Sequence, residues 1–292
     1  MTRELGVVGA GTTGQGIVQT AAHAGIDVIF CEKSEESVNE ALEAITVALD
    51  REIERWGMTK TDKTVILSRI RGTTAPEELK GAPLVIEAVS DNLTLKSKVF
   101  SALDSVLPPE TILVTNTSSL SITQLAAVTN RPDRVVGMHF LSPVPKRPLV
   151  EVVRGLHTSD ETVRLAKEFA TEIKKTAIEV FEYPGFVTTR LILPLLNEAM
   201  HVVMEGVASA SDVDTAMTLG YNFPSGPLEV ADRMGLDEVL LWMEHLFHEL
   251  GDLKYRPCPL LRKMVRAGEL GVKTGKGFFV YDEAGRRVKS HP

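Results

Sequence analysis

The stretch that decides the fold is Leu5-Gly6-Val7-Val8-Gly9-Ala10-Gly11-Thr12-Thr13-Gly14, near the start of the 292-residue chain. A short apolar run leads directly into G-x-G-x-x-G, and a helical stretch follows. Gly9 permits a tight turn, Gly11 lets the backbone approach a pyrophosphate, and Gly14 lets the helix pack close to the strand. Thr12 and Thr13 begin that helix, whose free N–H groups and dipole favour an anion. The stretch therefore predicts a pyrophosphate-binding turn between a strand and a helix.

The residues after this turn support a dinucleotide-binding motif. A helix predicted over 12–24 ends at Gly25, and an apolar run over 27–30 precedes Glu32, 18 residues after Gly14. An acid at this point of a dinucleotide-binding fold binds the adenosine ribose, and its charge repels a 2′-phosphate. We therefore expect NAD rather than NADP, although Lys33 beside Glu32 softens the repulsion. The alternative is a glycine-rich turn with a surface acid, which the ordered strand, glycines, helix, strand and acid disfavour.

Composition limits the functional classes. The chain is 43% hydrophobic and 24% charged with a net charge of −7, as in an ordinary globular protein. It has no Lys/Arg-rich tract and no apolar run of membrane-spanning length, so neither nucleic acid nor a membrane is an expected partner. Cys31 and Cys258 form no metal-ligand spacing, which predicts no metal site and a reducing compartment. Because residues 1–4 lead straight into a strand, we expect no signal peptide and a cytoplasmic protein.

Alternating strand and helix patterns continue to about residue 183 and predict an α/β, doubly wound, Rossmann-type domain over 1–183. A helical hairpin over 35–56 and 61–70 is predicted as an insertion in it. Strands are expected over 84–88, 111–115, 134–138, 149–153 and 176–181.

From residue 184 the pattern is helical, which predicts an all-α C-terminal domain over 184–292. Its helices are expected over 186–206, 211–219, 227–250 and 259–267, with Ser211 as the N-cap of the second.

His139 is the best candidate for a catalytic base among seven histidines. It follows a predicted strand ending at Met138, at the carboxyl edge where a doubly wound sheet binds its ligands. Glu151 lies in the next predicted strand, and neighbouring parallel strands would bring the two side chains together. A carboxylate on one imidazole nitrogen would fix the tautomer, as in acid–histidine pairs of hydrolases. A structural histidine is the alternative. His245 and His248, three apart on a helix, fit an exposed face better than a metal pair.

Seven motifs follow one another in order along the chain. They are NTSSL at 116–120, HFLSPVP at 139–145, LVEVV at 149–153, PGFV at 184–187, FPSGPLE at 223–229, YRPCPLL at 255–261 and KTGKGFF at 273–279. Together they resemble the L-3-hydroxyacyl-CoA dehydrogenase family, and most of all its bacterial 3-hydroxybutyryl-CoA members. The resemblance spans the whole chain.

This resemblance implies an NAD-dependent oxidation of an L-3-hydroxyacyl-CoA to the 3-ketoacyl-CoA, with no metal. It implies His139 as the general base, Glu151 as its orienting partner, and Ser118, 21 residues before His139, as a hydrogen-bond donor to the reacting oxygen. It also implies Lys96 near the nicotinamide ribose and Lys273 as a further cofactor contact. The helical domain of the family forms a homodimer, and the acyl thioester lies between the two domains.

Several positions depart from the family pattern. Thr189 and Ser142 stand where the family usually has asparagine, and Asp91 stands where it has glutamate. Ala48 and Arg55 align with a serine and a lysine that contact CoA, and Arg55 can still hold a phosphate. Basic residues of the hairpin are further phosphate candidates, although a solvated helix face explains any one of them as well: Lys60, Lys63, Arg69 and Arg71.

Two rival functions stay open at this point. The departures at Thr189, Ser142 and Ala48 motivate a dehydrogenase of the same fold that acts on a free hydroxy acid or a carrier-protein thioester. A non-catalytic nucleotide-binding protein is the other rival, which the intact set of Ser118, His139 and Glu151 disfavours. Lysine-dependent β-hydroxyacid dehydrogenases share the glycine motif but not the His139 and Glu151 motifs.

Overall fold

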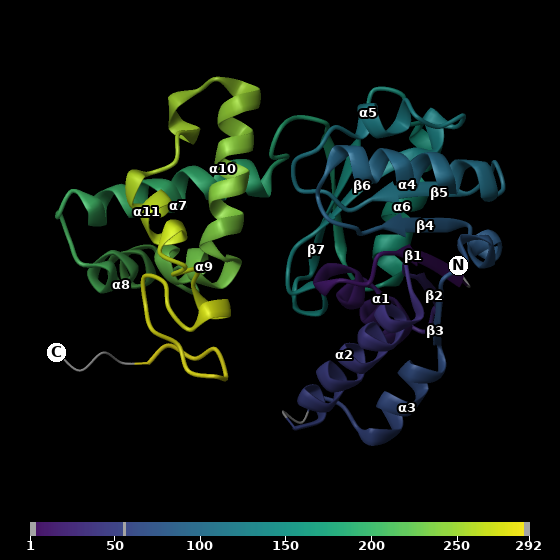
Figure 1. Ribbon diagram of the computed structural model, residues 1–292, viewed down its shortest axis with the longest axis horizontal. Coiled ribbons are helices and arrows are strands. Elements are labelled where there is room, and N and C mark those ends of the chain that lie inside the picture. Colours follow the sequence, from purple (N-terminus) through teal and green to yellow (C-terminus); the bar gives the residue numbers. More distant parts are fainter. Residues whose placement is uncertain (1–3, 55–56, 289–292) are drawn as a thin grey trace. The chain divides into compact units, whose positions relative to one another are not determined.

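A computed structural model describes residues 4–54 and 57–288 of the chain (Figure 1). The chain divides after Phe186 into an N-terminal unit and a C-terminal unit, each with its own buried core. The predicted fold class is confirmed: the first unit is a doubly wound α/β domain, and the second is built mainly from helices.

The N-terminal unit is organised around one eight-stranded sheet of order β3-β2-β1-β4-β5-β6-β7-β8. Every neighbouring pair in it is parallel except β6 and β7. The order reverses between β1 and β4, which places the ligand crevice of a doubly wound sheet at the carboxyl ends of these two strands. The strands are β1 (Glu4–Val8), β2 (Asp27–Cys31), β3 (Ile70–Thr73), β4 (Leu84–Glu87), β5 (Ile112–Thr115), β6 (Val135–Phe140), β7 (Leu149–Arg154) and β8 (Thr176–Phe181).

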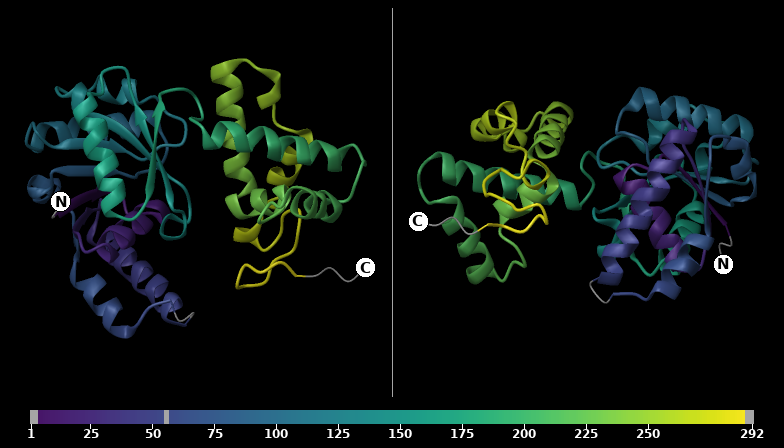
Figure 2. Two further views of the ribbon diagram at one scale, coloured as in Figure 1. Left: turned by 180° about the vertical axis from the view of Figure 1, so that it is seen from behind. Right: turned by 60° about the horizontal axis from the view of Figure 1, so that its bottom comes forward.

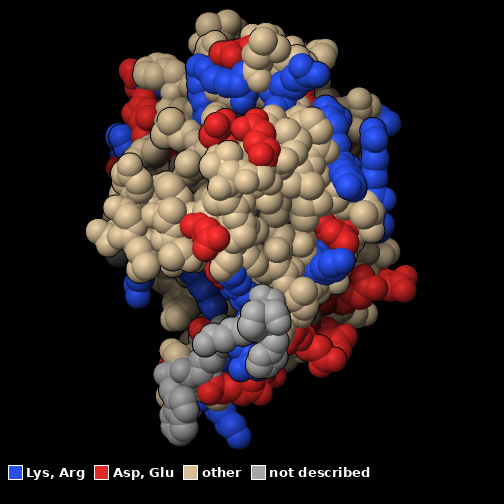
Figure 3. Space-filling view, turned by 90° about the vertical axis from the view of Figure 1, so that its left-hand side faces the viewer, with Lys and Arg blue, Asp and Glu red and all other residues tan. Residues whose placement is uncertain are grey.

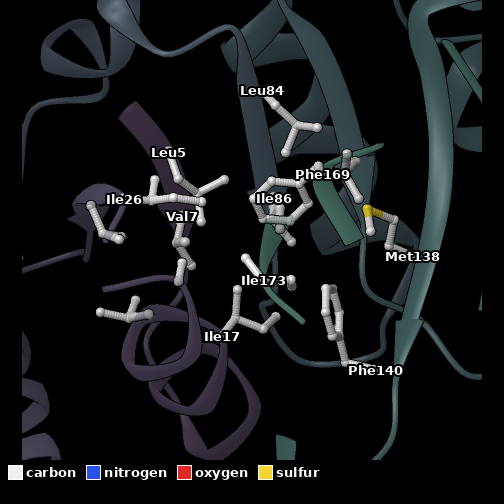
Figure 4. Close-up of a cluster of buried hydrophobic side chains, with 14 of the residues drawn as sticks. Leu5, Val7, Ile17, Ile26, Leu84, Ile86, Met138, Phe140, Phe169 and Ile173 are labelled. Atoms are coloured by element: carbon white, nitrogen blue, oxygen red, sulfur yellow. The ribbon is translucent and has the colours of Figure 1, made fainter. Parts of the chain in front are cut away.

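Helices cover both faces of this sheet (Figure 2). One face packs on α1, α2 and α6, and Figure 4 shows its core, where Val7 and Ile86 of the sheet meet Ile17 and Phe169 of the helices. The other face packs on α4 and α5 through Phe100 and its neighbours. Side chains alternate between the two cores along each strand, as the pleat requires. The helices are α1 (Thr12–His23), α2 (Glu35–Glu54), α3 (Lys60–Ser68), α4 (Leu93–Val106), α5 (Ile122–Ala126) and α6 (Asp160–Glu172).

Two details of the sheet differ from the prediction. The helix expected to run to residue 70 ends at Ser68, and β3 follows it as a strand that was not predicted. With only four residues, β3 gives too short an alternation to detect. The strands that carry His139 and Glu151 are neighbours, as predicted, but they are antiparallel, and β6 continues through His139 to Phe140. The eight residues that join them are too few for a parallel crossover, which requires a dozen or more.

The C-terminal unit packs its helices around a core that includes Leu193, Leu228, Val239 and Tyr255. Ser209, not Ser211, caps α8, because its hydroxyl accepts from the N–H of Asp212. The helix expected over 227–250 is two helices, since Gly235 at φ +96° interrupts it. The helices are α7 (Thr188–Met204), α8 (Ala210–Tyr221), α9 (Pro227–Met234), α10 (Leu236–Leu250) and α11 (Pro259–Arg266). No helix within residues 4–54 and 57–288 has the length and apolar character to cross a membrane.

Candidate active site

The glycine motif forms the turn between β1 and α1. Gly9 has φ +89°, a conformation that only glycine adopts freely. A Cβ at Gly14 would lie 2.0 Å from the carbonyl oxygen of Gly9, so the third glycine permits the close contact of helix and turn. A Cβ at Gly11 would meet no atom within 4 Å, so the protein itself does not require glycine there. Gly11 caps α1 without a side-chain acceptor, which leaves Thr12 and Thr13 at an open helix N-terminus.

Glu32 directly follows β2 and reaches this turn. Its Oε1 accepts a hydrogen bond from the backbone N–H of Ala10 at 2.5 Å, and its Oε2 accepts from Lys33 N–H at 3.3 Å. A carboxylate beside the glycine turn is the arrangement that a dinucleotide-binding fold uses for a ribose hydroxyl. The open space at Gly11, the uncapped helix and this carboxylate all fit a bound dinucleotide.

His139 and Glu151 occupy directly paired positions on β6 and β7. Nδ1 of His139 and Oε2 of Glu151 are 2.6 Å apart, and the two side chains are 9% and 0% exposed. A carboxylate only accepts, so Nδ1 is the protonated nitrogen and Nε2 of the neutral ring is left as an acceptor. The ring of Phe186 lies 5.8 Å from the imidazole, tilted by 56°. This is the geometry of an oriented general base.

Asn116 holds the other side of β6. Its Oδ1 accepts from the backbone N–H of Phe140, the residue after His139, at 3.1 Å. The β5–β6 backbone pairing ends at Thr115 and Gly137, so this side chain extends the connection toward the histidine. The backbone around His139 is therefore fixed by β7 on one edge and by Asn116 on the other.

Ser118 lies in the loop after β5 and is bonded to Asp91 in the loop after β4. Oδ2 of Asp91 accepts from both the backbone N–H and the hydroxyl of Ser118, each at 3.4 Å. The two residues follow neighbouring strands of the sheet, at the edge where β1 and the glycine turn also end. The structure thus brings the loops that carry these two predicted contacts together.

Lys96 and Glu87 form an ion pair in which neither side chain is exposed. The Lys96 ammonium lies 2.7 and 3.0 Å from the two Glu87 oxygens and 3.1 Å from the carbonyl oxygens of Val89 and Asn116. Four acceptors surround an ammonium that has three hydrogens. Burial raises the pKa of Glu87, and the charge of Lys96 opposes that rise. Lys96 therefore connects the loops after β4 and β5, and its contact with a nicotinamide ribose stays a prediction.

The remaining predicted site residues lie in varied surroundings. Ser142 is exposed, and its carbonyl accepts from Nε of Arg147 at 3.3 Å. Lys60 is exposed at the start of α3, and Arg55 lies outside the described residues. In the C-terminal unit, Thr189 is buried in α7, and Nζ of Lys273 lies 2.6 Å from Oδ2 of Asp237.

Sequence reasoning did not identify Glu87 and Asn116 as part of this site. The sequence could have identified Glu87, because it ends the apolar run LVIE and a buried acid must have a partner. Asn116 stands in a polar turn, where asparagine is common for local reasons. Its bond to Phe140 joins residues 24 apart in the chain, and local sequence gives no sign of it.

Residues 4–183 match the family model for the NAD-binding domain of 3-hydroxyacyl-CoA dehydrogenase, and residues 185–281 match the model for its C-terminal domain. The chain belongs to the 3-hydroxyacyl-CoA dehydrogenase family. It is an NAD-dependent oxidoreductase, and NAD is its cofactor.

Individual members of the 3-hydroxyacyl-CoA dehydrogenase family are similar over nearly their full lengths. A probable 3-hydroxybutyryl-CoA dehydrogenase of Bacillus subtilis is 49% identical over 96% of this chain and 98% of the relative. The 3-hydroxybutyryl-CoA dehydrogenase of Clostridioides difficile is 45% identical over 96% of this chain and 100% of the relative. The crystal structure of (S)-3-hydroxybutyryl-CoA dehydrogenase from Ralstonia eutropha superposes with a TM-score of 0.91 at 45% identity, covering 97% and 100% of the two chains.

Proposed function

We propose that this dehydrogenase oxidises a short-chain L-3-hydroxyacyl-CoA, such as 3-hydroxybutyryl-CoA, to the 3-ketoacyl-CoA in a reversible reaction. The main support is the 2.6 Å pair of His139 and Glu151. The loop that holds Ser118 is tied to the same strand, because Asn116 at its start accepts from the N–H of Phe140. The names of the similar proteins from Bacillus subtilis, Clostridioides difficile and Ralstonia eutropha support the choice of the four-carbon acyl group.

Each residue of the site has a defined task in this reaction. Nε2 of His139 removes the proton of the C3 hydroxyl, and Glu151 stabilises the imidazolium that forms. The Ser118 hydroxyl donates a hydrogen bond to the same oxygen as it becomes a carbonyl oxygen. NAD bound at the glycine turn would supply the acceptor for the hydride of C3. In reverse, protonated His139 and Ser118 polarise the keto oxygen.

Cofactor selectivity belongs to Glu32 in this proposal. Its carboxylate, held at the glycine turn by Ala10 N–H, accepts from the adenosine ribose and repels a 2′-phosphate. Gly11 and the N-terminus of α1 bind the pyrophosphate. Asp91, Lys96, Ser142 and Lys273 complete the cofactor site, and Thr189, Arg55 and Lys60 serve the substrate.

We also propose a homodimer formed through the C-terminal unit. Five large apolar side chains of this unit are 70–79% exposed: Leu191, Val207, Leu219, Tyr221 and Leu253. Figure 3 shows few Lys, Arg, Asp or Glu side chains across the middle of the face turned to the viewer. Burying such side chains against a second copy removes apolar surface from water. Light scattering tests this, with an expected mass of about twice 31.9 kDa.

We place the protein in the cytoplasm. Cys31 and Cys258 are both free and buried, in keeping with a reducing compartment. Fractionation of the cells of origin would test this, and recovery of the protein outside the cytoplasmic fraction would contradict it.

A substrate panel tests the proposed reaction. When purified protein is mixed with NADH and acetoacetyl-CoA, the absorbance of NADH should fall as NADH is oxidised. Turnover of free acetoacetate or of an acyl-carrier thioester, but not of the CoA ester, would contradict the proposal and favour the alternative raised by Thr189 and Ser142. Binding of NADH without turnover of any of them would point to a non-catalytic role.

A further inference from the structure

Phe186 is the last residue of the N-terminal unit, and its ring packs against the imidazole of His139. The two ring centroids lie 5.8 Å apart with the planes inclined by 56°, within the range of favourable aromatic contacts. Phe186 is only 4% exposed. The residue that ends the first unit is therefore in direct contact with the candidate base.

The ring and the imidazole lie on the same side of the sheet. Gly137 and His139 are two residues apart on β6 and so share a face, whereas Met138 between them points into the opposite core (Figure 4). A Cβ at Gly137 would lie 2.8 Å from Cδ1 of Ile122, a residue of α5. His139 thus projects to the face that α5 covers, and Phe186 belongs to the core of that face.

The backbone of Phe186 has an unusual conformation. Its φ is +47°, in the left-handed region that bulky side chains rarely adopt. The residue follows Pro184 and Gly185, whose φ is +79°, and its N–H donates to the carbonyl oxygen of Tyr183 at 2.9 Å to close the turn. Glycine would adopt this φ without a steric cost but would provide no ring. A phenylalanine in this conformation indicates that the ring has a task there.

Glu182 fixes the start of this turn to α5. Its Oε2 accepts from the backbone N–H of Thr123 at 3.0 Å, and its carboxylate also accepts from the hydroxyls of Thr123 and Ser121. Ser121 is the N-cap of α5 and directly follows the loop that carries Ser118. The turn that presents the phenyl ring is therefore held by the same helix that ends the Ser118 loop.

The bond to Glu151 by itself leaves the imidazole some freedom. A hydrogen bond stays favourable over about 30° of bending, so the bond at Nδ1 allows the ring to tilt. Tilting moves Nε2, the nitrogen that exchanges the proton with the reacting oxygen. A misplacement of about 1 Å at a reacting group costs about a hundredfold in rate. A second contact that fixes the plane of the imidazole has a direct effect on catalysis.

We propose that Phe186 is a positioning residue for His139, an inference that rests on the proposed function. Its ring sets the plane of the imidazole that Glu151 holds at Nδ1, and it keeps water away from this bond. The turn over residues 183–186, fixed by Glu182, keeps the ring in place. Phe186 acts only through His139 and contributes to binding of neither substrate nor NAD.

The test replaces the ring by an apolar side chain that is not planar. In Phe186→Leu, the rate of hydride transfer from NADH to acetoacetyl-CoA, measured in a single turnover, should fall about ten- to hundredfold. KM for acetoacetyl-CoA and the dissociation constant for NADH should stay within about twofold. Combined with His139→Gln, Phe186→Leu should cause no further loss, because its effect passes through the imidazole. If Phe186→Leu does not fold, Phe186→Met takes its place in every measurement.

Phe169→Leu is the matched control. Phe169 is a buried phenylalanine of the same unit, 1% exposed, and it packs in the core on the opposite face of the sheet (Figure 4). The two Leu variants remove the same atoms from a buried site, so both should lower Tm. Only Phe186→Leu should slow hydride transfer.

A second measurement needs no turnover. The proton on Nδ1 of His139, identified in the NMR spectrum by its absence in His139→Gln, should exchange with water faster in Phe186→Leu than in the wild type or in Phe169→Leu. The reason is that the bond to Glu151 opens more often once the ring is gone. If the wild type does not turn over acetoacetyl-CoA, the proposed function fails by itself, and this exchange rate still tests the positioning.

Four results would overturn the inference. The first is an unchanged rate of hydride transfer in Phe186→Leu, and the second is an equal loss of rate in Phe169→Leu. The third is a further loss when Phe186→Leu is added to His139→Gln. The fourth is an unchanged exchange rate of the Nδ1 proton in Phe186→Leu.

Discussion

His139 and Glu151 face each other across the antiparallel strands β6 and β7, with Nδ1 and Oε2 2.6 Å apart. Directly paired residues of antiparallel strands project their side chains to the same face of the sheet. The pairing register therefore brings the acid to the imidazole without help from a flexible loop. Because Glu151 is fully buried, its charge stabilises a protonated imidazole more strongly than it would in water.

Replacing His139 tests its role as the base. His139→Gln should lower kcat by about 10²–10⁴-fold, because no other group takes the hydroxyl proton. The dissociation constant for NADH, measured by fluorescence, should stay within about twofold, since the imidazole binds the reacting oxygen and not the cofactor. A variant with wild-type turnover would exclude His139 as the base.

Glu151 is expected to act only through His139. Glu151→Gln keeps the size of the side chain but removes the charge that fixes the Nδ1–H tautomer and stabilises the imidazolium. We expect kcat to fall by about 10²–10⁴-fold with little change in KM for acetoacetyl-CoA. The double variant with His139→Gln should be no slower than His139→Gln alone. Additive losses would show that Glu151 has a separate function.

A substitution at Gly11 should change the affinity for the cofactor without changing the stability of the fold. Gly11→Ala adds a Cβ into space with no atom within 4 Å, so Tm should stay nearly unchanged. Affinity for NADH should nevertheless fall at least tenfold, because the methyl group occupies the path of the pyrophosphate. Gly14→Ala is the contrasting variant: its Cβ would lie 2.0 Å from the Gly9 carbonyl oxygen, so both Tm and NADH affinity should fall. Unchanged NADH affinity in Gly11→Ala would place the pyrophosphate elsewhere.

Glu32 should determine the choice of nucleotide. Glu32→Ala removes the acceptor of Ala10 N–H and the charge that repels a 2′-phosphate. NADH affinity should fall by about one order of magnitude, the loss of one or two hydrogen bonds to a charged group. NADPH affinity should rise or stay constant, so the ratio of NADH affinity to NADPH affinity should decrease. Glu77→Ala, which removes an acid in the helical turn before β4, is a matched control and should leave that ratio as in the wild type.

Asp104 gives the N-terminal unit a pH-dependent stability. Burial by itself raises the pKa of Asp104, but hydrogen bonds from Asn130 and Arg131 outweigh it and hold the pKa below its usual value. A lowered pKa in the folded state stabilises the fold above the unfolded pKa of about 3.9, and this stabilisation is lost as pH falls through the folded pKa. Asp104→Asn should therefore cost about 1–3 kcal/mol of unfolding free energy at pH 7.

Calorimetry across pH checks this expectation. The difference in Tm between wild type and Asp104→Asn should be largest near neutral pH and should shrink as the pH approaches about 3. Asp133→Asn, a change at an exposed acid, should give a small difference at every pH. A constant difference for Asp104→Asn would mean that the charge of Asp104 contributes nothing.

The sequence predicted most elements of the fold because the signals are local. The glycine turn, the apolar strands and the long amphipathic helices follow from the periodicity of neighbouring residues. The sequence did not predict β3, because four residues give too little periodicity. It did not predict the break at Gly235, because the helical pattern continues on both sides of that residue. The N-cap of α8 shifted from Ser211 to Ser209 because either serine satisfies the capping pattern.

By itself the sequence determined the glycine turn between the first strand and the first helix and the helical character of the second half, and it predicted His139, Glu151 and Ser118 as site residues. Only the tertiary structure decided that β6 and β7 run antiparallel and that Glu87 holds Lys96. It alone decided that Asn116 fixes Phe140 and that Lys63, Arg69 and Arg71 face carboxylates. The physical reason is range: turn and helix propensities act over a few residues, whereas strand direction and charge pairing depend on contacts between residues far apart in the chain.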